Sequence, residues 1–223
     1  MSSCDVLLLA AFHPELAPLR RVLGEGMRAR VGGLDVAARI VGIGLPVAAA
    51  GAAMQLAEEM PRLAILLGTC GAYREAGIDL GRVVAPRRSR LAAPSVVDGV
   101  AQFPEPMSVL ADTHTAITDA LVREGALEGD VATTLAITID DAAASRVARA
   151  TTAAIEHLEA HGVAAACAAR GVPFAAALGV ANRVGSHARD EWRANHRNAA
   201  AAAADVVVRT LAALPPSMIR SPR

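Results

Sequence analysis

Apolar runs of strand length that alternate with helical patterns constrain the fold of this chain most strongly. Residues 6–11, 34–41 and 63–67 are such runs, and the first two lead into helical patterns that open at Pro14 and Pro46. Strands that alternate with helices are typical of α/β proteins. We therefore predict a three-layer α/β/α fold around a central mixed, twisted sheet.

The rest of the chain continues the alternation without a composition break. Further strands are predicted at 81–85, 131–139 and 173–180, further helices at 107–124, 155–170 and 192–214, and an irregular excursion at 86–106. Asp140 or Asp141 can cap the helix after 139. We predict one domain over residues 1–214 and a polar, frayed tail over 215–223.

Composition excludes several classes of function. Of the 223 residues 53% are hydrophobic and 2% aromatic, and the formal net charge is zero. A neutral chain has no electrostatic surface for nucleic acid or an anionic membrane, and the apolar run at 6–11 is too short to span a bilayer. Three widely spaced cysteines (Cys4, Cys70 and Cys167) and a start without a basic leader favour the cytoplasm.

Two motifs could bind a cofactor or a metal, but each has a simpler explanation. Gly42-x-Gly44 lies between a strand and a helix, yet it lacks the third glycine of a dinucleotide loop, so a tight turn is favoured. His157 and His161 have the i, i+4 spacing of a zinc pair on a helix, yet no third ligand is evident. We expect two partly solvated histidines, no metal and no cofactor.

Other charged or glycine-rich segments allow a structural reading as well. Residues 86–90 are a basic run that we expect to be a solvated loop. Glu15 suits the positive end of a helix dipole. Gly68-Thr69-Cys70-Gly71 is either an ordinary turn or a place where backbone approaches a ligand closely.

Glu159 and Asn182 are harder to explain structurally. Glu159 has the apolar neighbours Ile155 and Val163 on the predicted helix, and a buried carboxylate without a partner is costly. Asn182 follows the strand at 173–180, and ligands in α/β sheets bind beyond the carboxyl ends of strands. A carboxylate and a carboxamide at one sheet edge can hold a sugar and a purine base.

The order of motifs resembles the purine nucleoside phosphorylase/nucleosidase superfamily, and within it the futalosine hydrolases. The resemblance spans residues 4–211, and its motifs are 41–44, 68–71, 77–84, 156–160, 171–174 and 179–182. It implies an enzyme that hydrolyses futalosine to release hypoxanthine in menaquinone biosynthesis. Its partner is then a small-molecule purine nucleoside, and a neighbouring subunit is expected to close the site, most simply in a homodimer.

The resemblance also implies roles for single residues. Glu15 matches the acid that activates water, and Asn182 the residue at the N7 edge of the purine; these two are the predicted catalytic residues. Glu159 matches the acid that holds the ribose hydroxyls. The remaining predicted binding residues match positions around the sugar and the base: Ile43, Thr69, Cys70, Gly71, Ile139 and Leu158.

The sequence also departs from the family. Leu66 stands where hexameric phosphorylases have a phosphate-binding arginine, which favours water as the nucleophile. Leu178 and Ala181 replace family residues whose hydrogen bonds would orient Glu15 and Asn182, and the bulky His161 stands among positions that are usually small. Two alternatives therefore stay open. One is a catalytically silent purine-binding protein, and the other is a methylthioadenosine/adenosylhomocysteine nucleosidase, which Asn182 disfavours.

Overall fold

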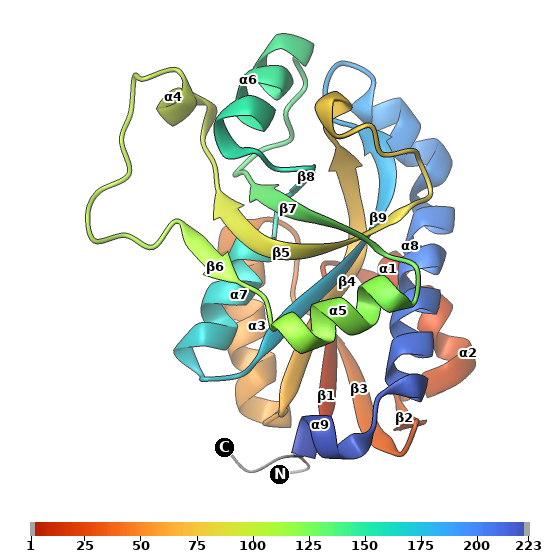
Figure 1. Ribbon diagram of the computed structural model, residues 1–223. Coiled ribbons are helices and arrows are strands. Elements are labelled where there is room, and N and C mark those ends of the chain that lie inside the picture. The colour runs from red at the N-terminus through yellow and green to blue at the C-terminus, as the bar shows by residue number, and fades with distance from the viewer. Residues whose placement is uncertain (1–2, 221–223) are drawn as a thin grey trace.

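A mixed sheet of nine strands organises the computed structural model, which describes residues 3–220. Neighbours follow the order β2-β3-β1-β4-β8-β7-β5-β6, and β9 pairs with β4 and β5 (Figure 1). Parallel pairs such as β1–β4 and β4–β9 coexist with antiparallel pairs such as β2–β3 and β5–β9. The strands are β1 Val6–Ala10, β2 Arg28–Val31, β3 Leu34–Ile40, β4 Leu63–Ala72, β5 Val83–Leu91, β6 Leu110–Asp112, β7 Leu127–Thr133, β8 Ile155–His157 and β9 Phe174–Arg183.

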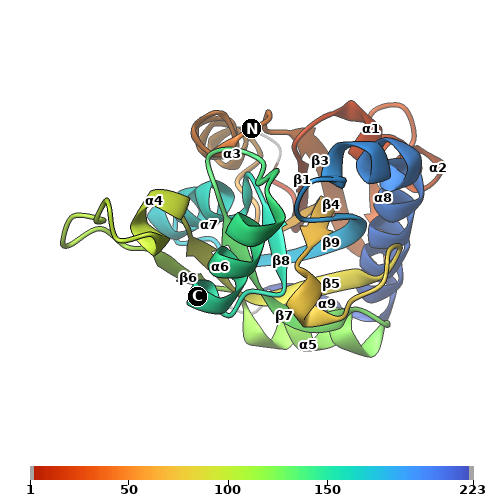
Figure 2. The same ribbon diagram turned by 90° about the horizontal axis from the view of Figure 1, so that it is seen from above.

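Helices cover both faces of this sheet, as the alternation predicts (Figure 2). One face packs against α5, α8 and the short helices α1 and α2, and the other packs against α3 and α7. The helices are α1 His13–Leu16, α2 Arg20–Leu23, α3 Leu45–Glu59, α4 Pro94–Val97, α5 Thr115–Arg123, α6 Asp141–Thr151, α7 Ala160–Ala169, α8 Ala188–Ala213 and α9 Pro216–Arg220, with 3-10 turns η1 Ala17–Leu19 and η2 Arg74–Ala76.

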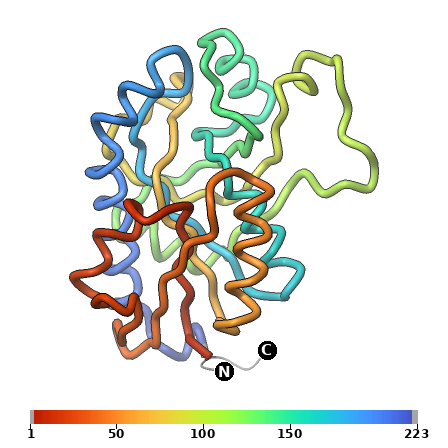
Figure 3. The backbone as a smooth tube through the Cα atoms, turned by 180° about the vertical axis from the view of Figure 1, so that it is seen from behind, coloured from red at the N-terminus to blue at the C-terminus, as the bar shows by residue number. Residues whose placement is uncertain are grey.

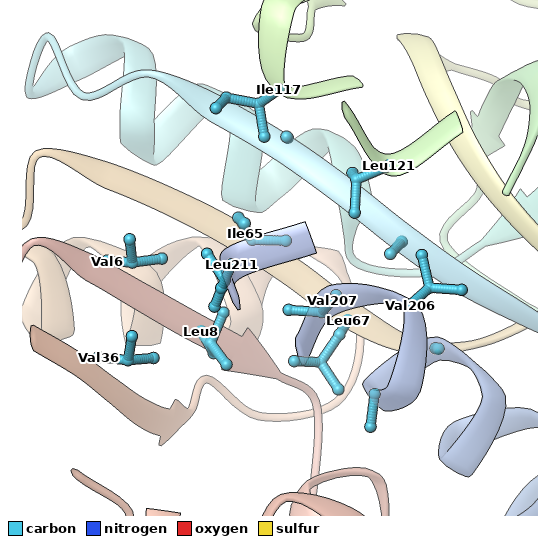
Figure 4. Close-up of a cluster of buried hydrophobic side chains, with 14 of the residues drawn as sticks. Val6, Leu8, Val36, Ile65, Leu67, Ile117, Leu121, Val206, Val207 and Leu211 are labelled. Atoms are coloured by element: carbon cyan, nitrogen blue, oxygen red, sulfur yellow. The ribbon is translucent and has the colours of Figure 1, made fainter. Parts of the chain in front are cut away.

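Small aliphatic side chains build the core. Along β1, Val6 and Leu8 face the α8 side while Leu7 and Leu9 face the α3 side, as the two-residue period of a strand requires (Figure 4). Helix α8 comes so close to β9 that a Cβ on Gly179 would lie 2.1 Å from the Ala199 carbonyl oxygen. The alanine-rich sequence of α8 therefore permits a close contact between the helix and the sheet.

Several predicted elements are corrected by the structure. Residues 86–90 are not a solvated loop but part of β5, where Arg87 pairs with Asp119 and Glu128, each at 2.6 Å. The excursion predicted at 86–106 lies instead at 92–109, contains the short helix α4 and projects from the sheet (Figure 3). The predicted helix 107–124 shortens to α5 because β6 precedes it, and the predicted frayed tail is, up to Arg220, the helix α9. Residues 221–223 lie outside the described part.

The prediction of a helix over 155–170 is wrong at its start. Residues 155–157 form β8, which pairs with β7 in parallel and with the end of β4 in antiparallel fashion, so tertiary pairing overrides the local helical pattern. Helix α7 begins at Ala160, with Glu159 as its N-cap residue. Asn182 lies within the last two residues of β9. The carboxyl end of β9 and the β8–α7 junction consequently meet beside β4.

Candidate active site

A cavity of about 720 Å³ opens at the carboxyl ends of β1, β4 and β9. All nine residues that the sequence analysis selected line it, although they come from distant parts of the chain: Glu15, Ile43, Thr69, Cys70, Gly71, Ile139, Leu158, Glu159 and Asn182. This volume suits a nucleoside-sized ligand.

Glu15 is a buried carboxylate that accepts three hydrogen bonds. Its Oε2 accepts from the Ala11 N–H at 3.1 Å, and its Oε1 accepts from the Thr69 N–H at 2.8 Å and the Thr69 hydroxyl at 2.9 Å. Burial raises the pKa of Glu15 to about 7, although these hydrogen bonds oppose the shift. A carboxylate with this pKa can take a proton from water near neutral pH.

Gly68 and Gly71 are not a turn, contrary to one of the two readings of their motif. They lie inside β4, and neither has a positive φ. A Cβ on Gly68 would lie 2.7 Å from Glu15 Oε1, and a Cβ on Gly71 would lie 2.8 Å from Asn182 Nδ2. These glycines leave room for two polar side chains of the cavity against the strand.

Glu159 presents one carboxylate oxygen to the cavity. Its Oε1 accepts from the Gly44 N–H at 2.7 Å, and in residues 3–220 no group donates to Oε2. Gly44 has a φ of +85° and belongs to the turn between β3 and α3 that the sequence predicts. The Gly42-x-Gly44 turn thus orients Glu159, and an acceptor remains for a ligand hydroxyl.

The His157 side chain contacts Glu159 and the first turn of α7. Its Nδ1 accepts from the N–H groups of Glu159 and Ala160, each at 3.2 Å, so it caps the first turn of α7 and carries no proton there. Burial lowers the pKa of His157, which agrees with a neutral imidazole. The 3.2 Å contact between Nδ1 and Glu159 Oε2 is therefore a close approach rather than an ion pair.

The two histidines do not form a pair on a helix. His157 belongs to β8, and His161 lies on α7, where its Nε2 is 3.2 Å from the Ser108 carbonyl oxygen. Both are buried, so the expectation of partial solvation is wrong. Within residues 3–220 no group of three His, Cys, Asp or Glu side chains could hold a metal ion.

Asn182 is buried with part of its amide still available. Its Nδ2 donates to the Arg183 carbonyl oxygen at 2.9 Å. This bond fixes the plane of the side chain and uses one of its two N–H bonds. The second N–H bond and the Oδ1 oxygen have no partner within residues 3–220, so the amide can still donate to and accept from one ligand.

Apolar side chains complete the wall of the cavity. Leu158 is half-buried, whereas Ile43, Ile137 and Ile139 are 60%, 61% and 74% exposed. Ile139 is not the end of a strand as predicted, because β7 stops at Thr133. Large exposed isoleucines at a cavity mouth indicate a surface that a ligand or another chain covers.

Sequence reasoning missed a buried acid that holds the Ile137–Ile139 segment. Glu156 accepts from the Thr138 N–H at 3.0 Å, the Thr138 hydroxyl at 2.7 Å and the Tyr73 hydroxyl at 2.9 Å. Burial raises the pKa of Glu156. The side chain faces the cavity and fixes the loop that follows β7.

The N-terminal turns of α8 supply further lining residues that were not selected. Trp192 donates from Nε1 to the Thr69 hydroxyl oxygen at 3.2 Å, and Phe12 lies 6.1 Å from its ring. The basic side chains of the lining are Arg189 and Arg193, and both are exposed. A tryptophan and two arginines within five residues were the signal that could have identified this wall.

Comparison with known proteins places this chain in a family. The sequence profile of the phosphorylase superfamily matches residues 5–212 of the chain. The chain belongs to the phosphorylase superfamily. No protein of curated function matches the chain by sequence alone.

Solved structures of nucleosidases share the fold at low identity. The 5′-methylthioadenosine/S-adenosylhomocysteine nucleosidase of Neisseria meningitidis, in complex with methylthio-immucillin-A, has a TM-score of 0.82 and 19% identity over 94% of this chain and 99% of that one. The S-adenosylhomocysteine nucleosidase of Streptococcus pyogenes has a TM-score of 0.84 and 17% identity over 96% and 99%.

A futalosine hydrolase is also among these structures. A mutant of the enzyme from Helicobacter pylori strain 26695 has a TM-score of 0.80 and 14% identity over 93% of this chain and 97% of that one. The mixed α/β fold is therefore that of nucleosidases. Across residues 3–220 no helix is both long and apolar enough to cross a membrane.

Proposed function

We propose that this protein is an N-ribosyl hydrolase that releases a purine base, hypoxanthine, from a modified nucleoside. The observation that carries the proposal is the convergence of Glu15, Glu159 and Asn182 on one cavity. Each of them is buried, and at least one polar atom of Glu159 and Asn182 is left for a ligand. Buried polar groups without partners are costly unless a ligand uses them.

Glu15 is the proposed general base. Cleavage of the C1′–N9 bond passes through a sugar cation, and a water oxygen then bonds to C1′ while Glu15 accepts a water proton. The two Thr69 bonds and the Ala11 bond hold the carboxylate in place. Glu159 is the proposed ribose anchor, because its Oε2 can accept from the sugar hydroxyls.

Asn182 is the proposed contact of the leaving base. Its remaining N–H can donate to the 6-oxo group of hypoxanthine. N7 takes a proton from solvent water as the C1′–N9 bond breaks, and the Asn182 Oδ1 can accept from the N7–H that results. Adenine carries a 6-amino donor instead. Its 6-amino group and the protonated N7 would then both face the single acceptor of the amide, Oδ1. This pairing favours hypoxanthine over adenine.

The charges of the cavity support water rather than phosphate as the nucleophile. Leu66 is fully buried in the core on the α3 side and does not line the cavity. The arginines that do line it, Arg189 and Arg193, are exposed residues of the first turns of α8. Phosphate recognition by a buried arginine is thus not supported.

Futalosine is the proposed substrate, which would place the reaction in menaquinone biosynthesis. The motif resemblance and the futalosine hydrolase among the structural neighbours support it. The nucleosidases for methylthioadenosine and adenosylhomocysteine are as similar in fold, so they define the competing substrate class. An acid at the position of Asn182 would suit adenine. The asparagine therefore favours futalosine over the competing substrate class.

A substrate panel tests the proposal. Purified protein is incubated with futalosine, inosine, methylthioadenosine and adenosylhomocysteine, each with and without inorganic phosphate, and the free base is quantified. We expect hypoxanthine from futalosine at a rate that phosphate does not change. Adenine as the main product would instead support the competing class, and phosphate-dependent release would support a phosphorylase.

A catalytically silent base-binding protein is the second candidate, because Leu178 and Ala181 offer no polar group that could orient Glu15 or Asn182. Both side chains are fully buried and apolar. Calorimetric binding of hypoxanthine together with no base release from any member of the panel would favour this candidate.

A homodimer is the proposed assembly. Ile43, Ile137 and Ile139 are exposed at the cavity mouth, and Val47 on α3 adds a further exposed apolar side chain beside Ile43. A second copy that covers these residues would remove apolar area from water and close the cavity. The three cysteines are buried and free, which suits the proposed cytoplasmic location.

A further inference from the structure

A chain of two hydrogen bonds connects Trp192 with Glu15. The indole Nε1 donates to Thr69 Oγ1 at 3.2 Å, and Thr69 Oγ1 donates to Glu15 Oε1 at 2.9 Å. A hydroxyl has one proton, and an ionised carboxylate can only accept. Because the indole N–H fills an acceptor position of the Thr69 oxygen, the hydroxyl proton is left to point at Glu15.

Two other aromatic rings lie near the indole. Its ring stacks on His196, with a centroid distance of 4.4 Å and an angle of 16°, one turn further along α8. Phe12, which follows β1 and precedes the helix α1 that contains Glu15, lies at a centroid distance of 6.1 Å. Trp192 thus links the first turns of α8 to the strand and helix around Glu15.

Glu15 has little other side-chain support. Its remaining donors are the backbone N–H groups of Ala11 and Thr69, so within residues 3–220 the Thr69 hydroxyl is its one side-chain donor. Leu178, at a position where the resemblance suggests a polar residue that orients Glu15, is fully buried among apolar side chains.

We propose that Trp192 is a positioning residue for Glu15 and acts through the Thr69 hydroxyl. The inference rests on the proposed function, in which Glu15 is the base. Trp192 touches neither the carboxylate nor the reacting water in this account. It keeps the hydroxyl from turning its proton toward cavity water, and so maintains the bond that favours ionised Glu15.

The charged surroundings of Glu15 make this bond consequential. Burial and the negative charge of Glu159 raise the pKa of Glu15, and the two Thr69 bonds lower it. Cys70 on β4 is buried beside it and stays a neutral thiol, since burial raises its pKa. His13 on α1 is exposed, and His196 stands behind the indole. None of these groups donates to Glu15.

A double-mutant cycle tests the proposal. The variants are Trp192→Phe, Thr69→Val and both together, with Thr69→Ser as the rescue that restores the hydroxyl. The pKa of Glu15 is measured in two ways, by isotope-edited NMR titration of its carboxyl carbon and from the acid limb of kcat/KM. His196→Leu, which removes the stacking partner and keeps the indole N–H, is the matched control.

The expected result is a rise of about one unit in the pKa of Glu15 in Trp192→Phe, with kcat/KM on the acid limb about tenfold lower. Thr69→Val should shift the pKa in the same direction, and adding Trp192→Phe to it should change nothing further. Thr69→Ser and His196→Leu should titrate like the wild type.

An unchanged pKa of Glu15 in folded Trp192→Phe, or additive shifts in the double variant, would overturn the proposal. The NMR titration needs no turnover. A protein without nucleosidase activity but with the expected pKa shifts would refute the proposed function and retain the Trp192–Thr69–Glu15 coupling. An active enzyme without the shifts would refute the coupling alone.

Discussion

At the residue scale, the site depends on where side chains are missing as much as on where they are present. Gly68 and Gly71 have no Cβ, and the carboxylate of Glu15 and the amide of Asn182 occupy the space beside them. The sequence motif allowed either an ordinary turn or a close approach of backbone to a ligand. The structure shows close approach of the backbone to the protein's own polar side chains, which no local pattern could indicate.

The ionisation of Glu15 predicts a pH dependence of activity. A general base works in its ionised form, so kcat/KM should fall tenfold per pH unit below an apparent pKa of about 7. Above that pKa, Glu15→Gln should lower kcat by about 10² to 10⁴-fold. Steady-state base release across pH measures both. Substantial activity of Glu15→Gln would exclude Glu15 as the base.

The same group predicts a pH dependence of stability. The pKa of Glu15 rises from 4.5 to about 7 on folding, so between these values the folded chain keeps a proton that the unfolded chain has lost. Stability contributed by this group is therefore lost as pH rises through the window. Between about pH 4 and about pH 8, wild type should lose about 3 kcal/mol relative to Glu15→Gln. Urea unfolding of both proteins measures it, and parallel curves would contradict it.

Asn182 predicts a switch of base specificity. Asn182→Asp replaces the donor that faces a 6-oxo group with an acceptor, so hypoxanthine release should fall by about 10 to 100-fold while adenine release rises. The ratio of kcat/KM for inosine and adenosine measures this change. Asn182→Ala is the control, because it should slow both reactions without reversing their order.

At the element scale, strand pairing decides what local patterns cannot. Residues 155–157 have neighbours of helical periodicity, yet they form β8 because β7 and β4 provide pairing partners. This places Glu156 and His157 in the cavity wall and Glu159 at the N-terminus of α7. The sequence located Glu159 in the site through a family motif, while its backbone conformation depended on strands far away in the chain.

The close contact between α8 and β9 predicts that one methyl group added at Gly179 destabilises the protein. Gly179→Ala would push a Cβ to 2.1 Å from the Ala199 carbonyl oxygen, so α8 must shift, at a cost of about 1–3 kcal/mol. Gly26→Ala is the matched control, because no atom lies within 4 Å of its Cβ position and its φ is not positive; it should stay within about 0.5 kcal/mol of wild type. Thermal unfolding distinguishes the two, and equal stability would contradict the packing described.

At the scale of the whole molecule, alternation along the sequence predicted the three layers but not the strand order. The insertion of β8 between β4 and β7 and the pairing of β9 with both β4 and β5 depend on contacts between distant segments. Phe12 and Trp192 meet for the same reason, since β1 and α8 converge at one edge. The lining residues selected from sequence were matched to family positions, whereas Phe12 and Trp192, which topology brings together, were not selected.

The exposed apolar surface around the cavity mouth predicts an assembly. Val47 is 55% exposed on α3, so Val47→Asp should weaken the proposed homodimer and shift it toward monomer in sedimentation equilibrium. Val100 is 80% exposed on the 92–109 excursion, and Val100→Asp is the control that should leave the mass unchanged. A wild-type protein that is monomeric at all concentrations would refute the assembly.

The central claim is that three distant side chains form one hydrolytic site. In the most direct measurement, futalosine is incubated with wild type or with Glu15→Gln in isotopically labelled water without phosphate, and the products are analysed. With wild type we expect hypoxanthine and a sugar that carries the label at C1′, and with the variant neither product above background. Intact futalosine with folded wild-type protein, or a sugar without label, would contradict it.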